Sequence, residues 1–595
     1  MYIERVKKGK HVSVLLRESR REGQKIVKTT IANLSKLSPE VIDNLQKSLK
    51  GSNLVSSSDI IEHIECADTA PWGHVEAVLT ALDRLGFPEL IDPEPSDERR
   101  VIMGVVAARV LRPWSEDSTS LWRESCSLSA RLGLNDYDEN DICQAMDWLL
   151  PKRAEIEKRL ASRHLNNGDM VFLDISSSLY EGSKSSLINQ SDEEIFSENS
   201  SLIRRGYSRD KNRGQAQINY SLLTDKEGRP ISIKAYPGDI SDASIILPAL
   251  NKVRKDFGLS RVVLVGGRGL ISDEDITMLR QTDGVDWISA SRSTSIKSIV
   301  PEKGFQFKLF DEYDLCEFTA PEEYPSERLA ACVNPELQNK QAKARESLIE
   351  ATKEKLDKIV TRVKAGRLKK KENIALAVGR VIDKNKVNKY FILEFGDYFF
   401  NYSPNEESIN KEKTLDGIYV IRTSLPVEAF TIEDCVRQYK NLSRIERAFR
   451  TIKSVDLRVG PIDHRLGDRI RAHLFLTMLA YYVEWHLREV WRKLTVSAPN
   501  LAEMSKSRNP VSPARKSEKA VKRATSKMID ESSSIKALDF GEILANLATI
   551  SEVTLVLKQG GPNQSDLPFK RRKKFSPFQE KALKLLEEIP KYPPR

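Results

Sequence analysis

The sequence predicts a mixed α/β fold whose main sheet begins near residue 168. Three β-rich runs come first, DMVFLD, AQINYSLL and RPISIKAY, and a helical run, DASIILPALNKVRKDFG, follows them. A fourth run, RVVLVG, is almost wholly apolar, as expected for a buried strand. Three strands, a helix and a buried strand in this order fit a sheet on which helices pack.

The chain before this sheet divides into two regions of different texture. Residues 1–35 predict a small N-terminal β unit, because YIERV, VSVLLRES and KIVKTTIANL are separated by turn signals at Gly9 and Gly23. Residues 36–165 predict a helical region, in which runs such as VEAVLTALDRLGF carry apolar residues at helical spacing.

The chain after residues 166–300 divides into three further regions. Residues 301–435 predict a long charged helix, a basic patch and then the strands YFILEF, YFFNY and GIYVIRTS. Residues 436–500 predict helices. Residues 501–595 predict a basic linker and a tail that contains PFKRRKKF.

Composition limits the class of protein. The chain has 595 residues, and 40% of them are hydrophobic and 30% charged, which is typical of a soluble protein with several domains. Lys and Arg number 95 against 85 Asp and Glu, so the net charge of +10 favours an anionic partner.

Several classes of protein are disfavoured by local patterns. The six cysteines include no CxxC pair, which argues against a disulfide framework and a cysteine zinc site. The N-terminal MYIERVKKGK lacks the apolar core of a signal peptide. The longest apolar stretch, around Ala472–Val483, is too short and too polar to span a bilayer. We therefore expect a soluble intracellular protein with reduced cysteines.

Two motifs carry acidic residues that are suited to catalysis. Asp174 lies in VFLDISSS, where it either presents a carboxylate at the end of a strand or caps the next turn. Tyr439, Glu446 and Lys453 are spaced by seven, and Arg450 follows Glu446 by four, which predicts one face of a helix. The alternative for this helix is a solvated face with charge pairs.

Together, the two motifs follow the order of a ribonuclease-H-like nuclease core. In such a core, acids after the first strand, after the fourth strand and on a late helix meet at one edge. Clustered carboxylates are needed there because Mg²⁺ prefers oxygen ligands. Two ions about 3.5–4 Å apart activate the attacking oxygen and stabilise the leaving one. The GGRG sequence after the fourth strand is not a nucleotide-binding loop, since it fits neither glycine-rich phosphate motif.

The chain resembles the DDE transposases of bacterial insertion sequences, of insertion sequence family four and its long-chain relatives. The stretches that carry the resemblance extend over nearly the whole chain: FLDISSSLYEG, GYSRDKNRGQAQINYSLLTDKEGRPI, PGDISDASII, RVVLVGGRGLIS, LDGIYVIRTS and YKNLSRIERAFRTIK. The resemblance implies a ribonuclease-H-like catalytic core in two parts, 166–300 and 436–500. Between them it implies a β-containing insertion at 301–435, and before them a helical DNA-end-binding region.

The resemblance implies a catalytic site with one departure from the family. Asp174 matches the first acid and Glu446 the last, and both would ligate Mg²⁺. Gly267 stands where the family has the second Asp, in Gly-Arg-Gly instead of Asp-Arg-Gly. Asp242, in GDISD, is the nearest acid that could compensate, but it precedes the helix and does not follow the fourth strand.

The resemblance also implies residues that hold the DNA strand. The family pattern has an Arg three residues after its Tyr, where this chain has Leu442, and Arg444 is a neighbouring substitute. The four implied DNA-binding residues are Tyr439, Arg444, Arg450 and Lys453.

The implied activity is metal-dependent cleavage of DNA at terminal inverted repeats, followed by strand transfer into target DNA. The implied cofactor is two Mg²⁺ ions, with Mn²⁺ as a substitute. The implied partner is double-stranded DNA bound by a homodimer in the bacterial cytoplasm, associated with the nucleoid and without a membrane. Because Gly267 removes one ligand, the alternative is a catalytically silent derivative that binds transposon ends.

Overall fold

The structure is a computed structural model with two compact units. One unit comprises Met1–Ala70 and Ser551–Lys574, and the other comprises Pro71–Ile550 and Phe575–Arg595. The described residues are 1–9, 11–50, 64–111, 126–181, 202–207, 214–291, 296, 299, 315–385, 387–455, 457, 459–460, 462–495, 537–557 and 567–592. Across these ranges, no helix combines the length and the apolarity that a membrane crossing requires.

The first unit contains two three-stranded sheets and a helix. The N-terminal sheet has the order β1 (Tyr2–Lys8), β2 (His11–Glu22), β3 (Lys25–Asn33), which confirms the predicted strands. Helix α1 (Pro39–Leu49) is capped by the Ser38 side chain. The second sheet joins β4 (Ile64–Pro71), β16 (Ser551–Leu557) and β17 (Leu567–Arg572) in the order β17-β16-β4.

The second sheet departs from two sequence predictions. Strand β4 lies in the region 36–165, which was expected to be helical, and its neighbour β16 comes from the far end of the chain. The basic cluster near the C-terminus forms most of β17, in which Lys570 and Arg572 pair with Glu552. A pairing across so many residues leaves no local signal in either segment.

A helical layer in the second unit packs around α20 (Gly467–Trp491). The other elements of this layer are α3 (Gly73–Arg84), α4 (Phe87–Ile91), α5 (Asp97–Leu111), α7 (Leu128–Leu132), α8 (Glu139–Leu149), η2 (Leu150–Lys152), α9 (Arg153–His164), η8 (Arg492–Leu494), α23 (Phe540–Ala548), α24 (Pro577–Leu585) and η9 (Leu586–Glu588). Tyr481, Tyr482 and Trp491 of α20 are buried, as expected for core aromatic residues.

The main sheet has nine strands in the order β11-β12-β15-β10-β9-β5-β7-β6, with β8 paired to β7. Strands β5, β9 and β10 are parallel, and the remaining pairs are antiparallel. The strands are β5 (Met170–Leu179), β6 (Arg204–Arg205), β7 (Ala216–Thr224), β8 (Pro230–Pro237), β9 (Val262–Gly266), β10 (Val285–Ala290), β11 (Leu315–Phe318), β12 (Arg328–Val333) and β15 (Ile418–Thr423). Mixed α/β architecture is thereby confirmed.

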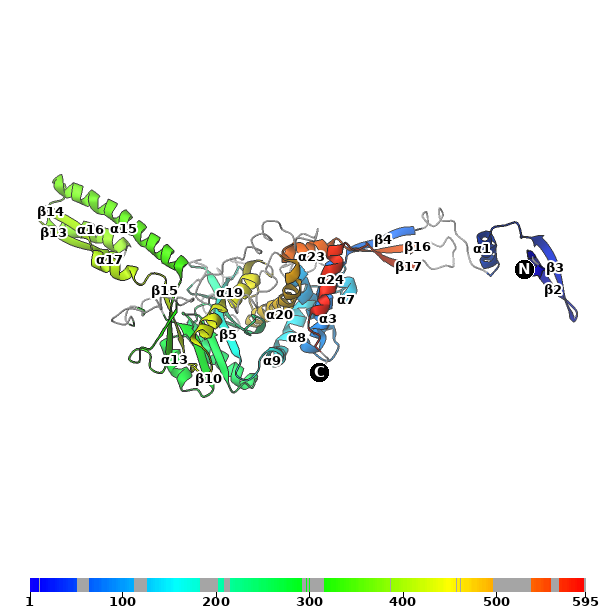
Figure 1. Ribbon diagram of the computed structural model, residues 1–595, viewed down its shortest axis with the longest axis horizontal. Helices are drawn as coiled ribbons and strands as arrows, with labels where there is room; N and C mark the ends of the chain where they lie inside the picture. The colour runs from blue at the N-terminus through cyan, green and yellow to red at the C-terminus, as the bar shows by residue number, and fades with distance from the viewer. Residues whose placement is uncertain are drawn as a thin grey trace. The chain divides into compact units, whose positions relative to one another are not determined.

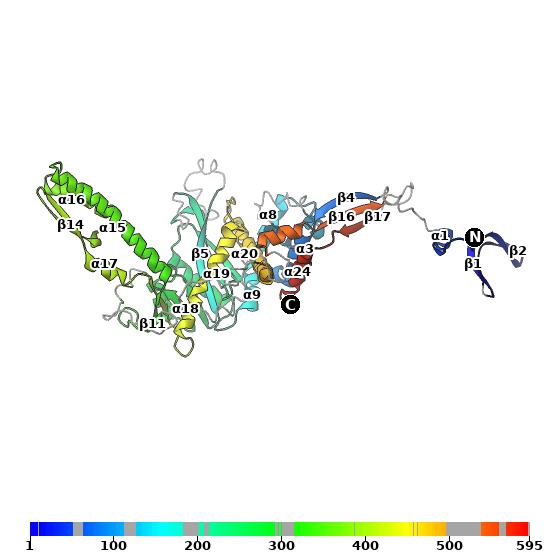
Figure 2. The ribbon, with the colours of Figure 1, turned by 45° about the horizontal axis from the view of Figure 1, so that its top comes forward.

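Helical segments follow β8 and β9 along the chain, and further helices carry the Glu446 motif. After β8 come η4 (Asp242–Ile245), α12 (Ile246–Asn251) and η5 (Lys252–Asp256), and α13 (Asp273–Arg280) follows β9. Helix α18 (Ile432–Lys440) packs against β9, β10 and β15. Helix α19 (Leu442–Arg450) runs beside β5, and η7 (Thr451–Val455) ends this helical run (Figure 2).

The insertion is smaller than the region predicted for it. Strands β11, β12 and β15 from that region extend the main sheet, and β15 lies between β12 and β10. The insertion itself has its own apolar core, and α16 and the β13–β14 hairpin lie along α15 (Figure 1). Its elements are α15 (Pro335–Lys364), α16 (Lys371–Asn385), η6 (Asn388–Tyr390), β13 (Phe391–Gly396), β14 (Phe399–Pro404) and α17 (Glu406–Lys413).

Candidate functional site

The register of two parallel strands brings the first and second acid positions together. Strand β5 pairs with β9 so that Leu173 lies opposite Gly266. The next residues along the two strands are Asp174 and Gly267, which therefore emerge side by side at about one strand spacing, ~4.8 Å. This is the arrangement that the sequence motifs require of the two positions.

The sequence suggested that Asp174 ends its strand, but in the structure it lies within β5. Strand β5 continues to Leu179 because it remains paired with β7, in which Leu222 lies opposite Asp174. What ends at this level is the pairing with β9, so Asp174 is the first residue beyond it. Its Oδ1 atom accepts a hydrogen bond of 2.9 Å from the backbone N–H of Ile175.

Gly267 is a glycine that the backbone does not require. Its φ lies outside the left-handed range, and a Cβ atom placed on it would meet no atom within 4 Å. Its neighbour Gly266 differs, because a Cβ there would lie 2.8 Å from the side chain of Ile271. Position 267 therefore accepts a Cβ atom, and its backbone conformation suits residues other than glycine.

Glu446 lies on α19, at the edge of the face that packs on the sheet. The buried residues of α19 include Leu442, Ile445 and Phe449, and the Phe449 ring lies 5.9 Å from that of Tyr220 on β7. At about 100° per residue, Glu446 follows the direction of Leu442 by about 40°. The glutamate is exposed while the helix beneath it is held by apolar contacts.

The predicted single helix is divided into three pieces. Tyr439 belongs to α18, Glu446 to α19 and Lys453 to the π-helical turn η7, and Asn441 separates the first two. Spacing by seven therefore does not place the three residues on one straight helix. Arg450 is the exposed last residue of α19, and Lys453 is half-buried. The DNA-binding roles of Arg450 and Lys453 stay predictions.

The phenol of Tyr439 reports how close the motif positions are to one another. Burial raises its pKa, and the carboxylates of Glu446 and Asp174 raise it further. The charge of Arg268 and a hydrogen bond with the Arg268 backbone act in the opposite direction. Asp174, Glu446 and Arg268, the residue directly after Gly267, therefore all lie near the space around this phenol.

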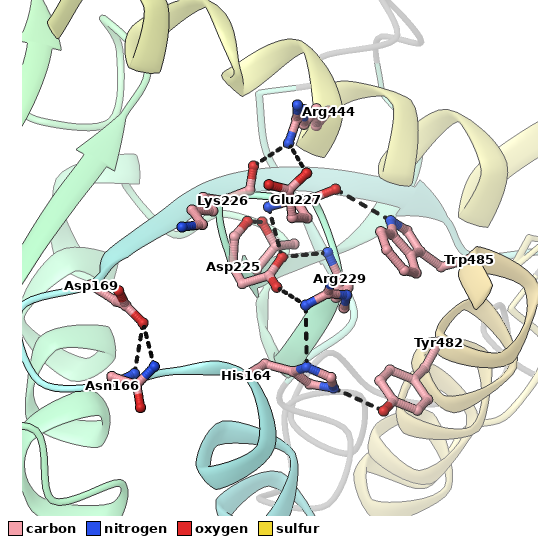
Figure 3. Close-up of polar contacts among 11 residues, drawn as sticks. His164, Asn166, Asp169, Asp225, Lys226, Glu227, Arg229, Arg444, Tyr482 and Trp485 are labelled. Carbon is pink, nitrogen blue, oxygen red and sulfur yellow. Dashed lines mark hydrogen bonds and ion pairs between the residues drawn. The ribbon is translucent and has the colours of Figure 1, made fainter. Parts of the chain in front are cut away.

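Arg444 points away from this space. Its Nη1 atom donates to the Lys226 carbonyl at 2.6 Å and to Glu227 Oε2 at 2.6 Å, both in the turn between β7 and β8 (Figure 3). On α19, Arg444 and Glu446 are separated by about 160° around the helix axis. Arg444 therefore does not occupy the direction of the buried Leu442, for which it was considered as a substitute.

The β7–β8 turn that holds Arg444 is itself fixed by a buried carboxylate. Asp225 Oδ1 accepts hydrogen bonds from the backbone of Glu227 and Arg229, each at 2.9 Å, and its Oδ2 accepts from Arg229 Nη1 at 2.9 Å (Figure 3). Burial raises the pKa of Asp225, and Arg229 lowers it. The sequence analysis missed these residues, although the DKEG run in this turn was a local signal.

The same turn is joined to the helical layer through His164. Arg229 Nη1 lies 3.3 Å from His164 Nδ1, and His164 Nε2 lies 2.8 Å from the Tyr482 hydroxyl (Figure 3). Because arginine has donors only, Nδ1 accepts and Nε2–H donates. Burial, followed by the charges of Arg229 and Arg163, lowers the pKa of His164 to about 3. The neutral imidazole is therefore a fixed link between α9, the turn and α20.

The residues at this edge supply fewer metal ligands than a two-metal centre needs. Of the three motif positions, Asp174 and Glu446 carry carboxylates and position 267 carries none. The end of β8, before Asp242, is separated from β9 by β7 and β5, about 14 Å at three strand spacings. Among the described residues, no group of three or more His, Cys, Asp or Glu side chains is placed to hold a metal ion.

One family model matches part of the chain. Residues 196–483, slightly less than half of the chain, match the model of the transposase DDE domain family. The matched span includes Gly267 and Glu446 and begins after Asp174. No curated protein matches the chain. A cryo-EM structure of the piggyBac transposase synaptic complex with hairpin DNA is similar at 9% identity, with 82% of this chain and 84% of that chain covered and a TM-score of 0.33. The family match supports a DDE transposase.

Proposed function

We propose that this chain is a DNA transposase of an insertion sequence that binds terminal inverted repeats, and that its catalytic centre lacks one of three carboxylates. The observation that carries the proposal is the β5–β9 register, which sets Asp174 beside Gly267, with the Glu446 helix packed on β5. The contiguous strands β8-β7-β5-β9-β10 support a ribonuclease-H-like core, because three antiparallel strands are followed by two parallel ones.

The metal-binding part of the proposal follows from the donor set. In an intact centre of this kind, two Mg²⁺ ions, or Mn²⁺, activate the attacking oxygen and stabilise the leaving oxygen. Two carboxylates and a glycine do not provide the oxygen ligands that such ions require. The residues present therefore do not fit the metal pair, and we derive no cleavage step for the chain as it stands.

The remaining residues of the site are suited to holding a DNA strand. Tyr439 and Lys453 belong to the two pieces, α18 and η7, that flank the α19 helix of Glu446. A lysine supplies a point charge to a phosphate, and Arg450 adds a second cation at the end of α19. We expect binding of duplex ends by a homodimer, as the family resemblance implies.

The second candidate function is cleavage by the chain as it stands, with another acid in place of the missing one. Asp242 is the candidate for that role, and β8, the strand that precedes it, is separated from β9 by β7 and β5. This separation, together with the absence of a three-ligand group among the described residues, favours the silent DNA-binding form.

Restoring the missing acid tests the proposal directly. The chain as given, Gly267→Asp and the uncharged control Gly267→Asn are incubated with duplexes that span the DNA flanking its gene, with Mg²⁺ or with EDTA. We expect Gly267→Asp to cut in Mg²⁺ at least about a thousandfold faster than the other two, since the charge completes the ligand set.

A second readout does not depend on activity. Three carboxylates without a metal repel one another, so Mg²⁺ should raise the melting temperature of Gly267→Asp and leave that of Gly267→Asn unchanged. Equal cleavage by the chain as given and by Gly267→Asp would show that another residue completes the site. No cleavage by either protein, with binding retained by both, would locate further damage outside position 267.

A further inference from the structure

Lys234 lies on the face of the main sheet that is opposite to α19. It belongs to β8, where it pairs with Ser221 of β7. Tyr220, the residue before Ser221, contacts Phe449 of α19 through its ring. Successive side chains of a strand point to opposite faces, so Ser221 and Lys234 point away from α19. The sheet therefore separates Lys234 from the helix that carries Glu446.

A second cation, Arg153 at the start of α9, lies near Lys234 on this face. Burial lowers the pKa of Lys234, and the charges of Lys252 and Arg153 lower it further. Burial raises the pKa of the Tyr236 phenol, and a hydrogen bond with Ser221 and the charge of Arg153 act in the opposite direction. The Lys234 Nζ atom lies 5.4 Å from the centroid of the Tyr236 ring. Lys234 and Arg153, here called the cation pair, therefore both lie close to Tyr236.

A buried carboxylate joins the three elements around the cation pair. Glu157 of α9 is fully buried, and its Oε1 atom accepts a hydrogen bond of 3.2 Å from the backbone N–H of Ile233 on β8. Its Oε2 atom pairs with Lys252, the first residue of η5. The turn η5 is π-helical, a rare geometry that is frequent at functional sites. The positions of α9, β8 and η5 are thus fixed by one side chain.

The cation pair has no carboxylate of its own. Over the ranges that the structure describes, neither Lys234 nor Arg153 forms an ion pair or a side-chain hydrogen bond. Glu157 and Asp256 attract Lys234 without reaching ion-pair distance, and Glu157 is already paired with Lys252. Both cations are half-buried. Two like charges that are partly withdrawn from water repel each other, and an anion bound between them would remove this cost.

We propose that Lys234 and Arg153, together with the Tyr236 hydroxyl, bind inorganic phosphate or a phosphate monoester. The Arg153 guanidinium can donate to two phosphate oxygens at once, and Lys234 supplies a point charge. The Tyr236 hydroxyl accepts from Ser221 Oγ at 3.4 Å, which leaves its own hydrogen for a phosphate oxygen. The inference does not depend on the proposed function.

Charge favours this ligand over other anions. A phosphate monoester carries a charge of about −1.5 to −2 at neutral pH, which matches the two cations. A carboxylate and a phosphodiester of the DNA backbone each carry a single negative charge and would leave one cation unmatched. The half-buried position of both cations also suits a small anion better than the surface of a duplex.

The test is a calorimetric titration of the full chain with inorganic phosphate at constant ionic strength. We expect one saturable site and a melting temperature that rises with phosphate concentration, whereas acetate should give neither. Lys234→Met should weaken phosphate binding at least about tenfold, because a charge-assisted contact is lost. The matched control is Lys255→Met, which removes an exposed lysine from the same turn, η5, and should bind phosphate as the parent does.

Lys234→Met also separates binding from folding. Without phosphate, the variant should melt at a higher temperature than the parent, because its methionine is not repelled by Arg153 and Lys252. With saturating phosphate, the parent should melt at the higher temperature. A lysine with only a structural role would not give this reversal. Arg153→Gln is a second variant, and it should weaken phosphate binding by a similar factor.

Several outcomes would overturn the inference. Equal phosphate binding by the parent and Lys234→Met would exclude Lys234 from the site. Equal stabilisation by acetate, or an equal loss in Lys255→Met, would show that the effect is one of charge alone. If the parent binds neither phosphate nor thymidine 5′-monophosphate, and Lys234→Met weakens binding of a short duplex, the cation pair contacts the DNA backbone instead. Phosphate binding is measured without DNA, so its failure leaves the proposed function untouched.

Discussion

The end of strand β9 and the base of the insertion each carry a glycine in a short connection, and the two glycines have different causes. Gly417 has a φ of +77°, and a Cβ atom on it would lie 2.7 Å from the Asn334 carbonyl oxygen and 2.7 Å from Gln338 Cβ. Gly267 has neither a left-handed φ nor any atom within 4 Å of its Cβ position. The fold requires the first glycine and tolerates a side chain at the second.

This difference separates positions that the fold determines from positions that the chemistry determines. At Gly417 the chain turns back from the insertion into β15, and its N–H donates to Gln341 Oε1 at 2.7 Å. At Gly267 the backbone makes no such demand, so the proposed loss of a carboxylate there has no cause in the fold. The packing of this fold is therefore compatible with a side chain at position 267 and also with none.

The largest stability effect is expected from Gly417→Ala. The alanine would combine a disfavoured φ with overlap against the backbone of Asn334, at a cost of about 2–4 kcal/mol in the free energy of unfolding. Gly267→Ala should instead be neutral or stabilise by up to about 1 kcal/mol, since alanine narrows the unfolded ensemble. Urea unfolding of both variants measures the contrast. Similar losses at the two positions would mean that Gly267 also has a structural cause.

Much of the core could be predicted because its signals are local. The runs that form β5, β7, β8 and β9 are apolar and short, and the structure then places Asp174 and position 267 on neighbouring parallel strands. The helical position of Glu446 was likewise predicted from its motif, and its catalytic role stays a prediction. The glycine at the expected acid position was visible in the sequence, but only the structure shows that position 267 has room for a Cβ atom.

The features that sequence could not supply depend on distant partners. Strand β4 forms next to β16, and β15 joins the main sheet after a long excursion through the insertion. No proline or glycine marks the break between α18 and α19 at Asn441. The φ of Asn441, −66°, also remains helical, so the break has no local signal in the sequence. Arg444 was predicted from its motif to contact DNA, and only the fold reveals the turn that accepts its hydrogen bonds.

A smaller effect is expected where the fold depends on a neutral histidine. The pKa of His164 falls from 6.5 to about 3 on folding, so below pH 6.5 the unfolded chain takes up a proton that the folded chain does not. Stability is therefore lost as the pH falls from 6.5 towards 3, by about 1.4 kcal/mol per pH unit. His164→Gln keeps an acceptor for Arg229 and a donor for Tyr482.

The comparison of parent and His164→Gln isolates this contribution. Between pH 6.5 and 5 the parent should lose about 2 kcal/mol more than the variant in urea unfolding. His486 also has a lowered pKa, mainly because of burial, and it remains in both proteins, so part of the pH dependence will persist. Identical pH profiles would show that His164 is protonated in the folded protein, or that the buried link is not formed.

The smallest effect on stability is expected at Arg444. Its role is either to stabilise the fold, as Gly417 does, or to contact DNA, as the motif implies. Its ion pair with Glu227 is partly exposed, so Arg444→Gln should reduce the free energy of unfolding by at most about 1 kcal/mol. If the side chain serves only to fix α19 on the β7–β8 turn, DNA affinity will match that of the parent, and in the Gly267→Asp background cleavage will fall about tenfold because Glu446 is less well placed.

Comparison with Lys453→Gln distinguishes the two roles of Arg444, DNA contact and positioning of α19. If Lys453 contacts a phosphate, Lys453→Gln should lower the DNA affinity with little change in stability. It should also reduce the slope of log K against log salt by about 1. If Arg444→Gln behaves in the same way, the role inferred from the motif is right, and the guanidinium leaves Glu227 when DNA binds. If Arg444→Gln lowers cleavage alone, Arg444 is a positioning residue that the fold requires, as it requires Gly417. Cleavage at this edge then depends both on residues that position α19 and on residues that contact DNA.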